Sequence, residues 1–312
     1  MKKYFGSVAL FLMTAAAVLS IVGCKKKEPA FEDELVFVEG AAFIMGNDDF
    51  SAGYNNRAHN AEVSSFYVGA TEVTQADFEA IMGYNPSFYV GESKGKAVTE
   101  GENQEKRPVE KISWYEAVMY CNKLSESRGL TPVYTKEVEG KDETDISLWG
   151  EVPEKANKEW NEIKWNKEAN GYRLLTEAEW EFAAKGGKLT SGKTSAGFDF
   201  YDDNVEYYVW AGINSKQLTH EVGLKEKNEL GLYDMNGNVW EWCWDWFSES
   251  YYKKEAAAEK DTSGPAIADY RVVRGGSWED EDETLTVFGR GSSSPHLPSR
   301  RIGFRIARSA SK

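Results

Sequence analysis

The sequence has few cysteines and few histidines, the residues that most often hold transition metals. Its 312 residues include three of each, and the histidines stand far apart, at His59, His220 and His296. Zinc sites need such residues in clusters, so the composition argues against one. Besides Cys24, the chain has only Cys121 and Cys243. They could form one disulfide in an oxidising compartment, but Cys121 falls in a predicted helix core, and we favour two buried free thiols.

Long hydrophobic runs are also scarce, and the one at the N-terminus is short. Residues 8–22 are apolar apart from Thr14 and Ser20, and two lysines precede them. A run of 15 residues suits the apolar part of a signal peptide and is short for a helix that spans a membrane. We therefore expect residues 1–23 to be a signal peptide.

The apolar run ends in Ile21-Val-Gly-Cys24, which resembles the bacterial lipobox. The resemblance implies cleavage after Gly23 and lipid attachment to Cys24, and several acyl chains on one cysteine would hold the protein firmly to a membrane. The alternative is an ordinary signal peptide that happens to contain a cysteine. Residues 24–34 are mostly charged and are interpreted as a tether. The predicted protein is a membrane-anchored lipoprotein on a bacterial cell surface.

Basic residues are outnumbered by acidic ones. The chain has 37 Lys and Arg against 51 Asp and Glu, which is a formal net charge of −14. Lys2 and Lys3 lie in the predicted signal peptide, so the mature chain would carry −16. Such a chain is a poor partner for nucleic acid or anionic lipid, because their phosphates attract positive charge. We expect no nucleic-acid ligand.

Aromatic residues are abundant, at 13% with 11 tryptophans, which is typical of a well-packed globule. Short strand patterns occur at residues 35–38 and 42–46. Three helix starts each place a hydroxyl at the N-cap and an acid three residues later; the pairs are Thr74 and Asp77, Ser113 and Glu116, and Thr176 and Glu179. The second helix should end near Gly129 and the third at Gly186 and Gly187. The apolar stripe of the second helix consists of Ala117, Val118, Cys121 and Leu124.

No linker divides residues 35–308, and we predict one α+β domain of short strands, a few capped helices and long loops. Residues 137–168 are dense in Lys, Glu, Asp and Asn, which indicates a surface insertion that could contain a helical turn. The boundaries of the predicted parts are therefore a signal peptide, a tether, and one domain with this insertion.

Four tryptophans alternate with other residues from Trp240 to Trp246. A period of two predicts a strand with all four indoles on one face, as in an aromatic core strand. A turn with Gly237 precedes this strand. Asp234 and Glu241 bracket the turn and could share one hard cation, with backbone carbonyls between them.

Seven segments, in this order, resemble the formylglycine-generating-enzyme (sulfatase-modifying factor) family. They are residues 66–74, 84–87, 107–109, 171–184, 231–246, 274–278 and 302–305. The resemblance runs from about residue 35 to residue 307 and implies the C-type-lectin-like fold of that family. It also implies a calcium site formed by the side chains of Asp234 and Glu241 and the carbonyls of Gly237 and Val239. Calcium is therefore expected as a structural ion.

The resemblance does not extend to the family's oxidase chemistry, which uses two copper-binding cysteines shortly after the Gly-Gly-Ser-aromatic motif. That motif is present at residues 275–278, but no cysteine follows Cys243. Without a thiolate there is no soft ligand for Cu(I) and no nucleophile of that type. Family members that use iron need a histidine cluster, which three isolated histidines do not supply. We predict a protein that is not an enzyme and holds no copper.

The C-terminal segment, residues 273–301, has neither helical nor strand periodicity. It contains an acidic run at residues 279–283 and a Ser- and Arg-containing stretch at 289–301. Composition alone favours a long solvated loop. The motifs on either side, Arg-Val-x-Arg-Gly-Gly-Ser-Trp before it and Ile-Gly-Phe-Arg after it, resemble those of the variable proteins of diversity-generating retroelements. Such proteins use the same fold as a binding scaffold.

A codon argument supports variation in this segment. Randomising the adenines of an AAC codon gives NNC, which cannot encode Glu, Gln, Lys, Met or Trp, and none of these occurs in residues 284–301. The candidate variable, ligand-binding positions are Val273, Asp280, Asp282, Thr284, Leu285, Thr286, Phe288, Gly289, Gly291, Ser292, Ser293, Ser294, His296, Leu297, Arg300 and Arg301. The codon rule argues against Glu279, Glu281 and Glu283. It leaves open whether Arg290, Pro295 and Pro298 are variable or framework.

The sequence thus predicts a rigid domain that binds ligands non-covalently through a replaceable surface. The expected anchors of binding are Phe288, His296, Leu297, Arg300 and Arg301, since aromatic and arginine side chains tend to dominate binding energy. The partner could be a host protein, another cell or a glycan, and the protein is expected to be a monomer. Two alternatives remain: a non-variable accessory or scaffold lipoprotein, and an oxidase with an unrecognised active site.

Overall fold

The computed structural model describes residues 35–48, 56–91, 97–189, 205–281 and 285–310. The predicted signal peptide, the tether and Cys24 lie outside these residues, as do two candidate variable positions, Asp282 and Thr284. No helix in the described part of the chain is both long and apolar enough to cross a membrane.

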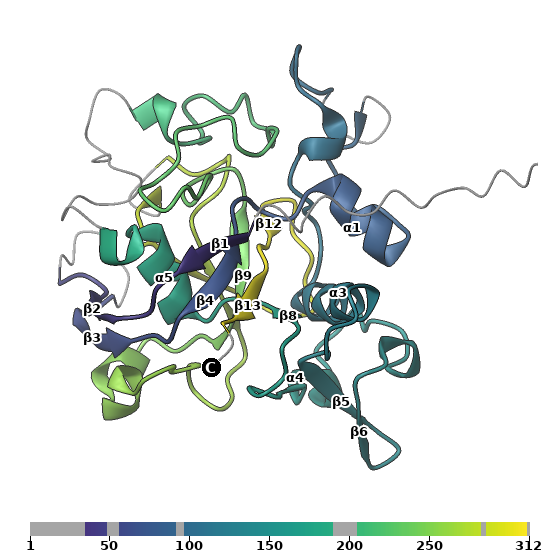
Figure 1. Ribbon diagram of the computed structural model, residues 1–312. Helices are drawn as coiled ribbons and strands as arrows, with labels where there is room; N and C mark the ends of the chain where they lie inside the picture. Colours follow the sequence, from purple (N-terminus) through teal and green to yellow (C-terminus); the bar gives the residue numbers. More distant parts are fainter. Residues whose placement is uncertain (1–34, 49–55, 92–96, 190–204, 282–284, 311–312) are drawn as a thin grey trace, which may run out of the picture.

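Two four-stranded sheets form the centre of the molecule (Figure 1). Across the first sheet the strands are β1 (Leu35–Val38), β4 (Phe66–Gly69), β13 (Ala307–Ser309) and β8 (Tyr172–Arg173). Across the second they are β11 (Arg290–Ser293), β10 (Arg271–Arg274), β9 (Trp240–Trp246) and β12 (Ile302–Gly303). In the first sheet β13, the last strand of the described chain, pairs antiparallel with both β4 and β8.

Two smaller sheets lie outside these. Strands β2 (Ala42–Met45) and β3 (His59–Glu62) form a pair, and β6 (Lys141–Glu143), β5 (Tyr134–Val138) and β7 (Lys164–Trp165) form three strands. The α-helices whose bounds lie in the described part of the chain are α1 (Gln75–Met82), α3 (Trp114–Ser127), α4 (Lys158–Asn161) and α5 (Glu177–Ala184). The 3-10 turns are η3 (Gln104–Lys106), η4 (Ile146–Leu148), η5 (Gly187–Leu189), η7 (Val205–Tyr207), η8 (Tyr251–Lys253) and η9 (Glu255–Ala258). The predicted α+β class, with short strands and long loops, is confirmed.

The three predicted helix starts are confirmed. Thr74, Ser113 and Thr176 are the N-caps of α1, α3 and α5, and each side chain accepts from the backbone N–H three residues later. In α3 and α5 the acid also reaches back to the cap, which completes a capping box. Helix α3 ends just before Gly129, which has φ +67°, and its predicted apolar stripe is fully buried. The local signals were sufficient here because capping depends on residues three apart.

Strand β9 separates two hydrophobic clusters. Trp240 and Trp242 belong to the cluster built around α3, with Trp244 packed against it, whereas Cys243 belongs to the cluster built around α5. The predicted placement of the indoles on one face is thus confirmed for Trp240, Trp242 and Trp244. The other face of the strand is buried as well, because Glu241, Cys243 and Asp245 are at most 3% exposed.

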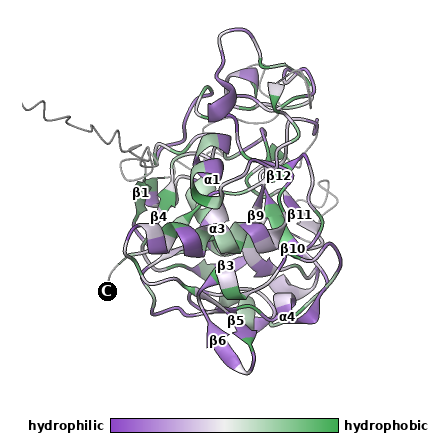
Figure 2. Cartoon of the chain, turned by 90° about the vertical axis from the view of Figure 1, so that its right-hand side faces the viewer, coloured by the Kyte–Doolittle hydropathy of each residue, from purple (hydrophilic) through white to green (hydrophobic). Residues whose placement is uncertain are grey.

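Residues 137–168 are less peripheral than their composition indicates. They contain β6, which is exposed and hydrophilic (Figure 2), and the predicted helical turn, which is α4. Trp149 and Trp160, however, are buried and lie edge to face at 5.9 Å between ring centroids. Trp160 also contacts Tyr115 of α3, so this segment contributes to the core. The high content of charged residues in this segment led to the prediction of a surface insertion, although two of its tryptophans are buried.

Cys121 and Cys243 are both buried free thiols, as expected. They lie in the separate clusters on the two sides of β9.

A candidate ligand-binding surface in the C-terminal segment

The last part of the segment, residues 294–301, connects β11 to β12 and is held to the rest of the molecule through its main chain. The carbonyl of Pro295 accepts from the backbone N–H of Trp114 at 2.9 Å, and that of Ser299 accepts from Lys111 at 2.9 Å. The carbonyl of Arg301 accepts from the N–H of Trp240 at 2.8 Å. We call residues 294–301 the crossing segment. It is not the free solvated loop that composition alone favoured.

The indole of Trp278 adds a fourth attachment, because its Nε1 donates to the carbonyl of Arg300 at 3.2 Å. Trp278 is itself buried, and its own backbone N–H donates to the carbonyl of Asn238 at 2.9 Å. The crossing segment is therefore tied to the turn that precedes β9. None of these four bonds uses a side chain of the crossing segment.

Several of the candidate variable positions are buried inside the protein. Val273 is 3% exposed in the core and Leu285 is fully buried beside Val209 and Ala211. Gly289 is also buried. In this structure these positions cannot offer side-chain atoms to a ligand. Spacing could not reveal this, because Val273 belongs to β10 and its burial comes from distant residues.

Asp280 has a structural role. Its Oδ2 accepts from the N–H of Ser277 at 2.8 Å, from the Ser277 hydroxyl at 2.7 Å and from the indole of Trp240 at 2.9 Å. It therefore closes the turn after β10 and fixes the orientation of an indole of β9. A change at this position would leave three donors without their acceptor.

The exposed candidates gather on the crossing segment and at the end of β11. Ser292, Leu297, Arg300 and Arg301 are exposed. Intermediate exposure is found at Thr286, Phe288, Gly291, Ser293, Ser294 and His296. Of the predicted anchors, Leu297 and the two arginines are thus the most accessible, with Leu297 half exposed.

Arg300 lies over two aromatic rings. Its guanidinium carbon is 5.5 Å from the ring centroid of Trp278 and 5.8 Å from that of Phe88. This arrangement orients a cationic side chain and keeps its edge available for other contacts. Phe88 was not a predicted site residue, and no local signal could have identified it, because it lies more than 200 positions away in the sequence.

The codon rule left open whether Arg290 is variable or belongs to the framework. The structure places it in the framework. It is 2% exposed, and its guanidinium donates to both oxygens of Glu177, at 2.5 and 2.7 Å. Its guanidinium carbon also lies 4.0 Å from the ring centroid of Tyr252.

Helix α5 anchors the framework through three glutamates, which stand at every second position of its sequence. Glu177 binds Arg290 of β11, and Glu179 binds Arg173 of β8 in a two-pronged pair at 2.6 and 2.8 Å. The third acid, Glu181, pairs with Arg274 of β10. All of these side chains are buried. The helix thus connects both central sheets, and the loss of any of these three arginines would take an ion pair from a buried carboxylate.

The four predicted calcium ligands do not all have free oxygens. Both oxygens of Glu241 accept from Arg305, at 2.6 to 2.9 Å, and one also accepts from the indole of Trp180 at 2.7 Å. Asp234 accepts from the N–H of Gly223 through Oδ2. Among the described residues, no group of three or more His, Cys, Asp and Glu is arranged to hold a metal ion. The predicted set of four ligands therefore does not fit a calcium ion in this arrangement, because both side-chain oxygens of Glu241 are already bonded to Arg305.

The acids around Arg305 are strongly perturbed. Burial, together with the charge of Asp234, holds the pKa of Glu72 well above its ordinary value. Burial also raises the pKa of Asp234 to about 6, with the nearby Glu241 adding to the effect. The structure therefore gathers acidic groups here without a matching number of cations, which favours their protonated forms.

The two described thiols are poorly suited to catalysis. Burial raises the pKa of Cys121 and raises that of Cys243 well above its ordinary value. Cysteine chemistry depends on the thiolate, which these environments disfavour.

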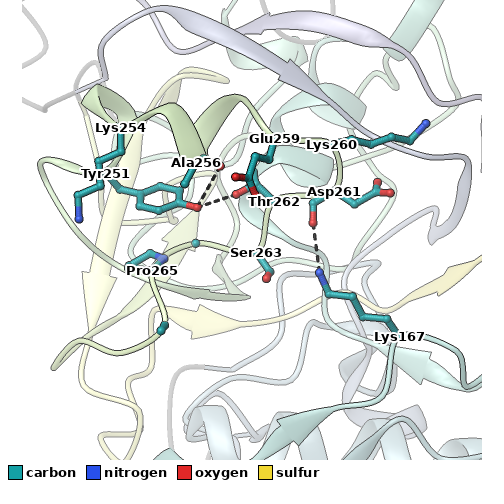
Figure 3. Close-up of a pocket in the computed structure, with 12 residues that line it drawn as sticks. Lys167, Tyr251, Lys254, Ala256, Glu259, Lys260, Asp261, Thr262, Ser263 and Pro265 are labelled. Atoms are coloured by element: carbon teal, nitrogen blue, oxygen red, sulfur yellow. Dashed lines mark hydrogen bonds between the residues drawn. The ribbon is translucent and has the colours of Figure 1, made fainter.

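A polar groove lies beside the loop at residues 259–266 (Figure 3). It has a volume of about 460 Å³, and the hydroxyl of Tyr251 points across it to the hydroxyl of Thr262 at 2.8 Å. Lys167 donates to the carbonyl of Asp261 at 3.3 Å on the other side. None of the residues that line this groove belongs to the C-terminal segment.

Comparison with known proteins gives consistent results. The family model of the sulfatase-modifying factor enzyme 1-like domain matches residues 23–310. The solved structure of Treponema denticola variable protein 1 is 36% identical, with a TM-score of 0.76 over 88% of this chain and 95% of its own. The chaperone protein LppX of Paenibacillus barcinonensis is 33% identical over 96% of this chain and 98% of that protein. The formylglycine-generating enzyme of Streptomyces coelicolor is 36% identical, but over 48% of this chain and 51% of the enzyme. The predicted family and fold type are confirmed.

Proposed function

The chain belongs to the sulfatase-modifying factor enzyme 1-like family, and on this premise we propose that it is a non-catalytic binding protein that uses the fold as a scaffold. Ligands would bind non-covalently to the exposed side chains of the C-terminal segment. The similarity to a variable protein over 88% of this chain supports this proposal at the level of the scaffold.

The observation that carries the proposal is the main-chain attachment of the crossing segment. Bonds from Lys111, Trp114 and Trp240 all end on its backbone carbonyls. Because every residue type has this carbonyl, the attachment does not depend on which side chains are present. Exposed side chains can therefore be exchanged at little cost in stability. Such a surface is suited to variation between copies of the gene.

Rigidity of the support adds to the proposal. The buried pairs of α5 hold β8, β10 and β11 in place. A binding surface that is ordered before the ligand arrives loses less conformational entropy on binding. Arg300, oriented by two aromatic rings, is an example in the present sequence.

We also propose that the mature protein is displayed from a membrane by lipid attached to Cys24, with residues 24–34 as a tether. The lipobox-like motif at residues 21–24 supports this. Radiolabelled fatty acid should be incorporated into the wild-type protein and not into Cys24→Ser.

The binding proposal is tested by selection from a displayed random peptide library on the immobilised domain. A triple variant, Leu297→Ala with Arg300→Ala and Arg301→Ala, should lose at least tenfold in affinity for the selected peptides while retaining the melting temperature of the wild type. The matched control removes one leucine and two basic side chains from an exposed part of the insertion, with Leu148→Ala, Lys155→Ala and Lys158→Ala. Equal binding by both triple variants would overturn the proposal.

A further inference from the structure

Arg271, the first residue of β10, is a buried cation that forms no ion pair with the described residues. Its Nη1 donates to the carbonyl of Trp244. Within the part of the chain that the structure describes, neither its Nε nor its Nη2 has a hydrogen-bond partner. Buried polar atoms nearly always have a partner, and burying an unpaired charge is costly, so this edge of the guanidinium needs an explanation.

Two other buried arginines show what this edge binds. Nε and Nη2 of Arg290 donate to the carboxylate of Glu177, and those of Arg305 donate to the carboxylate of Glu241. The two atoms form a planar fork that matches the two oxygens of a carboxylate. Arg271 presents the same fork without a carboxylate from the described residues.

Two indoles hold the guanidinium of Arg271 in place. Its carbon lies 3.7 Å from the ring centroid of Trp114 and 3.6 Å from that of Trp246. A guanidinium stacked on aromatic rings keeps its edges for hydrogen bonds. Because the side chain is already oriented, it would lose little conformational entropy when it binds a ligand.

Arg271 lines a groove between residues 161–164 of the insertion and the loop at residues 263–267. The groove has a volume of about 460 Å³, which is within the range of small-ligand sites. Trp244 and Trp246 of β9 line it together with Arg271. Its aliphatic surface comes from Ile163, Pro265, Ala266 and Ile267, of which Ile267 is 68% exposed. None of the lining residues belongs to the C-terminal segment at 273–301.

The charge of Arg271 is poorly balanced by its surroundings. The other charged side chains that line the groove, Glu162 and Lys164, already have ion-pair partners, at 3.7 and 2.7 Å. Burial lowers the pKa of Arg271 to about 9, and the nearby Asp245 offsets only part of this effect. Burial also raises the pKa of Asp245 to about 8, so this carboxyl is mostly protonated at neutral pH. A negative group in the groove would supply the missing partner.

We propose that this groove binds a carboxylate attached to an apolar group. The carboxylate would accept from Nε and Nη2 of Arg271, and the apolar group would pack against Ile267 and the other aliphatic side chains. A free organic acid and the C-terminal residue of a peptide share this chemistry. An acidic sugar fits less well, because an aliphatic wall offers its hydroxyls no hydrogen-bond partners. The site would give the protein a fixed specificity in addition to its proposed C-terminal binding surface.

The test uses the complete mature protein and hexanoate. On titration with hexanoate, the NMR signal of the Arg271 Nε–H should shift. Hexanamide, an uncharged analogue of similar shape, should bind at least about tenfold more weakly, because the bonds to Arg271 are no longer assisted by two charges. A short peptide that ends in leucine with a free carboxylate distinguishes the two sources. Binding at least as tight as that of hexanoate indicates a peptide C-terminus, and weaker binding indicates a free acid.

Two variants test the parts of the site. Arg271→Lys keeps the charge but loses the fork, and it should bind hexanoate at least about tenfold more weakly. Ile267→Asp should do the same, because it removes aliphatic surface and adds a like charge at the exposed rim. It also decides the question if Arg271→Lys does not fold. The matched control is Ile213→Asp, at an isoleucine that is 57% exposed outside the groove, and it should bind as the wild type does.

Three results would overturn the proposal. They are an Arg271 signal that hexanoate leaves unchanged, equal binding of hexanamide and hexanoate, and tighter binding of glucuronate than of hexanoate, which would indicate an acidic sugar. The triple variant at Leu297, Arg300 and Arg301 should bind hexanoate as the wild type does. Failure of this groove and failure of the C-terminal binding surface are therefore measured separately.

Discussion

Burial separates the arginines of the C-terminal segment into two kinds. Arg290 lies in the core against Glu177, whereas Arg300 lies on the surface over aromatic rings. The sequence presents both in the same stretch of glycine, serine and arginine, with no periodicity to distinguish them. The two arginines differ because Glu177 of α5, from a distant part of the chain, lies next to Arg290 and not next to Arg300.

A pair of substitutions tests this division. Arg290→Ala should lower the free energy of unfolding by about 3–5 kcal/mol, because the buried carboxylate of Glu177 loses the two hydrogen bonds that it accepts from Arg290 and keeps only Arg274 nearby, at 3.5 Å. Arg300→Ala should change it by no more than about 0.5 kcal/mol, as exposed substitutions usually do. Chemical denaturation of the two variants measures both effects, and similar losses would contradict the assignment.

A second prediction at the residue scale concerns Asp245. Burial, with the nearby charge of Glu177, raises the pKa of this carboxyl to about 8. The unfolded chain would lose the proton near pH 4, so the stability that the protonated form contributes is present below pH 4 and is lost as the pH rises through 8. The slope is at most about 1.4 kcal/mol per pH unit.

Asp245→Asn should remove this dependence, because an amide can still accept from the N–H of Glu177, as the acid does at 3.0 Å. The variant should therefore be more stable than the wild type at pH 8 and similar to it at pH 4. Denaturation across this range measures the difference. Parallel curves for the two proteins would show that Asp245 ionises normally.

At the scale of elements, the crossing segment completes helix α3. Trp114 is the first residue of this helix, and its N–H has no partner inside the helix. The carbonyl of Pro295 supplies that partner, and the carbonyl of Ser299 does the same for Lys111 just before the helix. The segment and the start of the helix are therefore expected to be ordered together.

Hydrogen exchange tests this coupling. The amide of Trp114 should exchange slowly in the wild type, at a rate close to that of amides inside α3. Changing only side chains, as in the triple variant at Leu297, Arg300 and Arg301, should leave that rate unchanged, because the bond ends on a carbonyl. Fast exchange in the wild type would mean that the segment is a free loop.

Elements that depend on residues a few positions apart could be predicted from the sequence. Elements that depend on contacts between distant residues could not. The caps at Ser113 and Thr176 and the alternation of β9 depend on neighbours a few residues away. Strand β11 was missed because its four residues, Arg-Gly-Ser-Ser, have no strand pattern and owe their pairing to β10. The role of Glu241 was also hidden, since its partner Arg305 is 64 residues away.

At the scale of the whole molecule, function depends on a division between support and surface. The two hydrophobic clusters on either side of β9, together with the buried ion pairs of α5, form the support. The C-terminal segment contributes Arg274 and Arg290 to that support and its exposed side chains to the surface. The family motifs predicted the support, whereas the accessible part of the surface was known only once the chain was folded.

The most direct test of this division, and of sequence diversification, is to sequence the 3′ end of the gene from many isolates. The account predicts substitutions at exposed positions such as Ser292, Leu297 and Arg300, and constancy at the buried Arg274 and Arg290. The changes should correspond to adenines of a nearby template repeat. An identical C-terminal segment in every isolate would contradict the account and leave a binding or scaffold protein of fixed specificity.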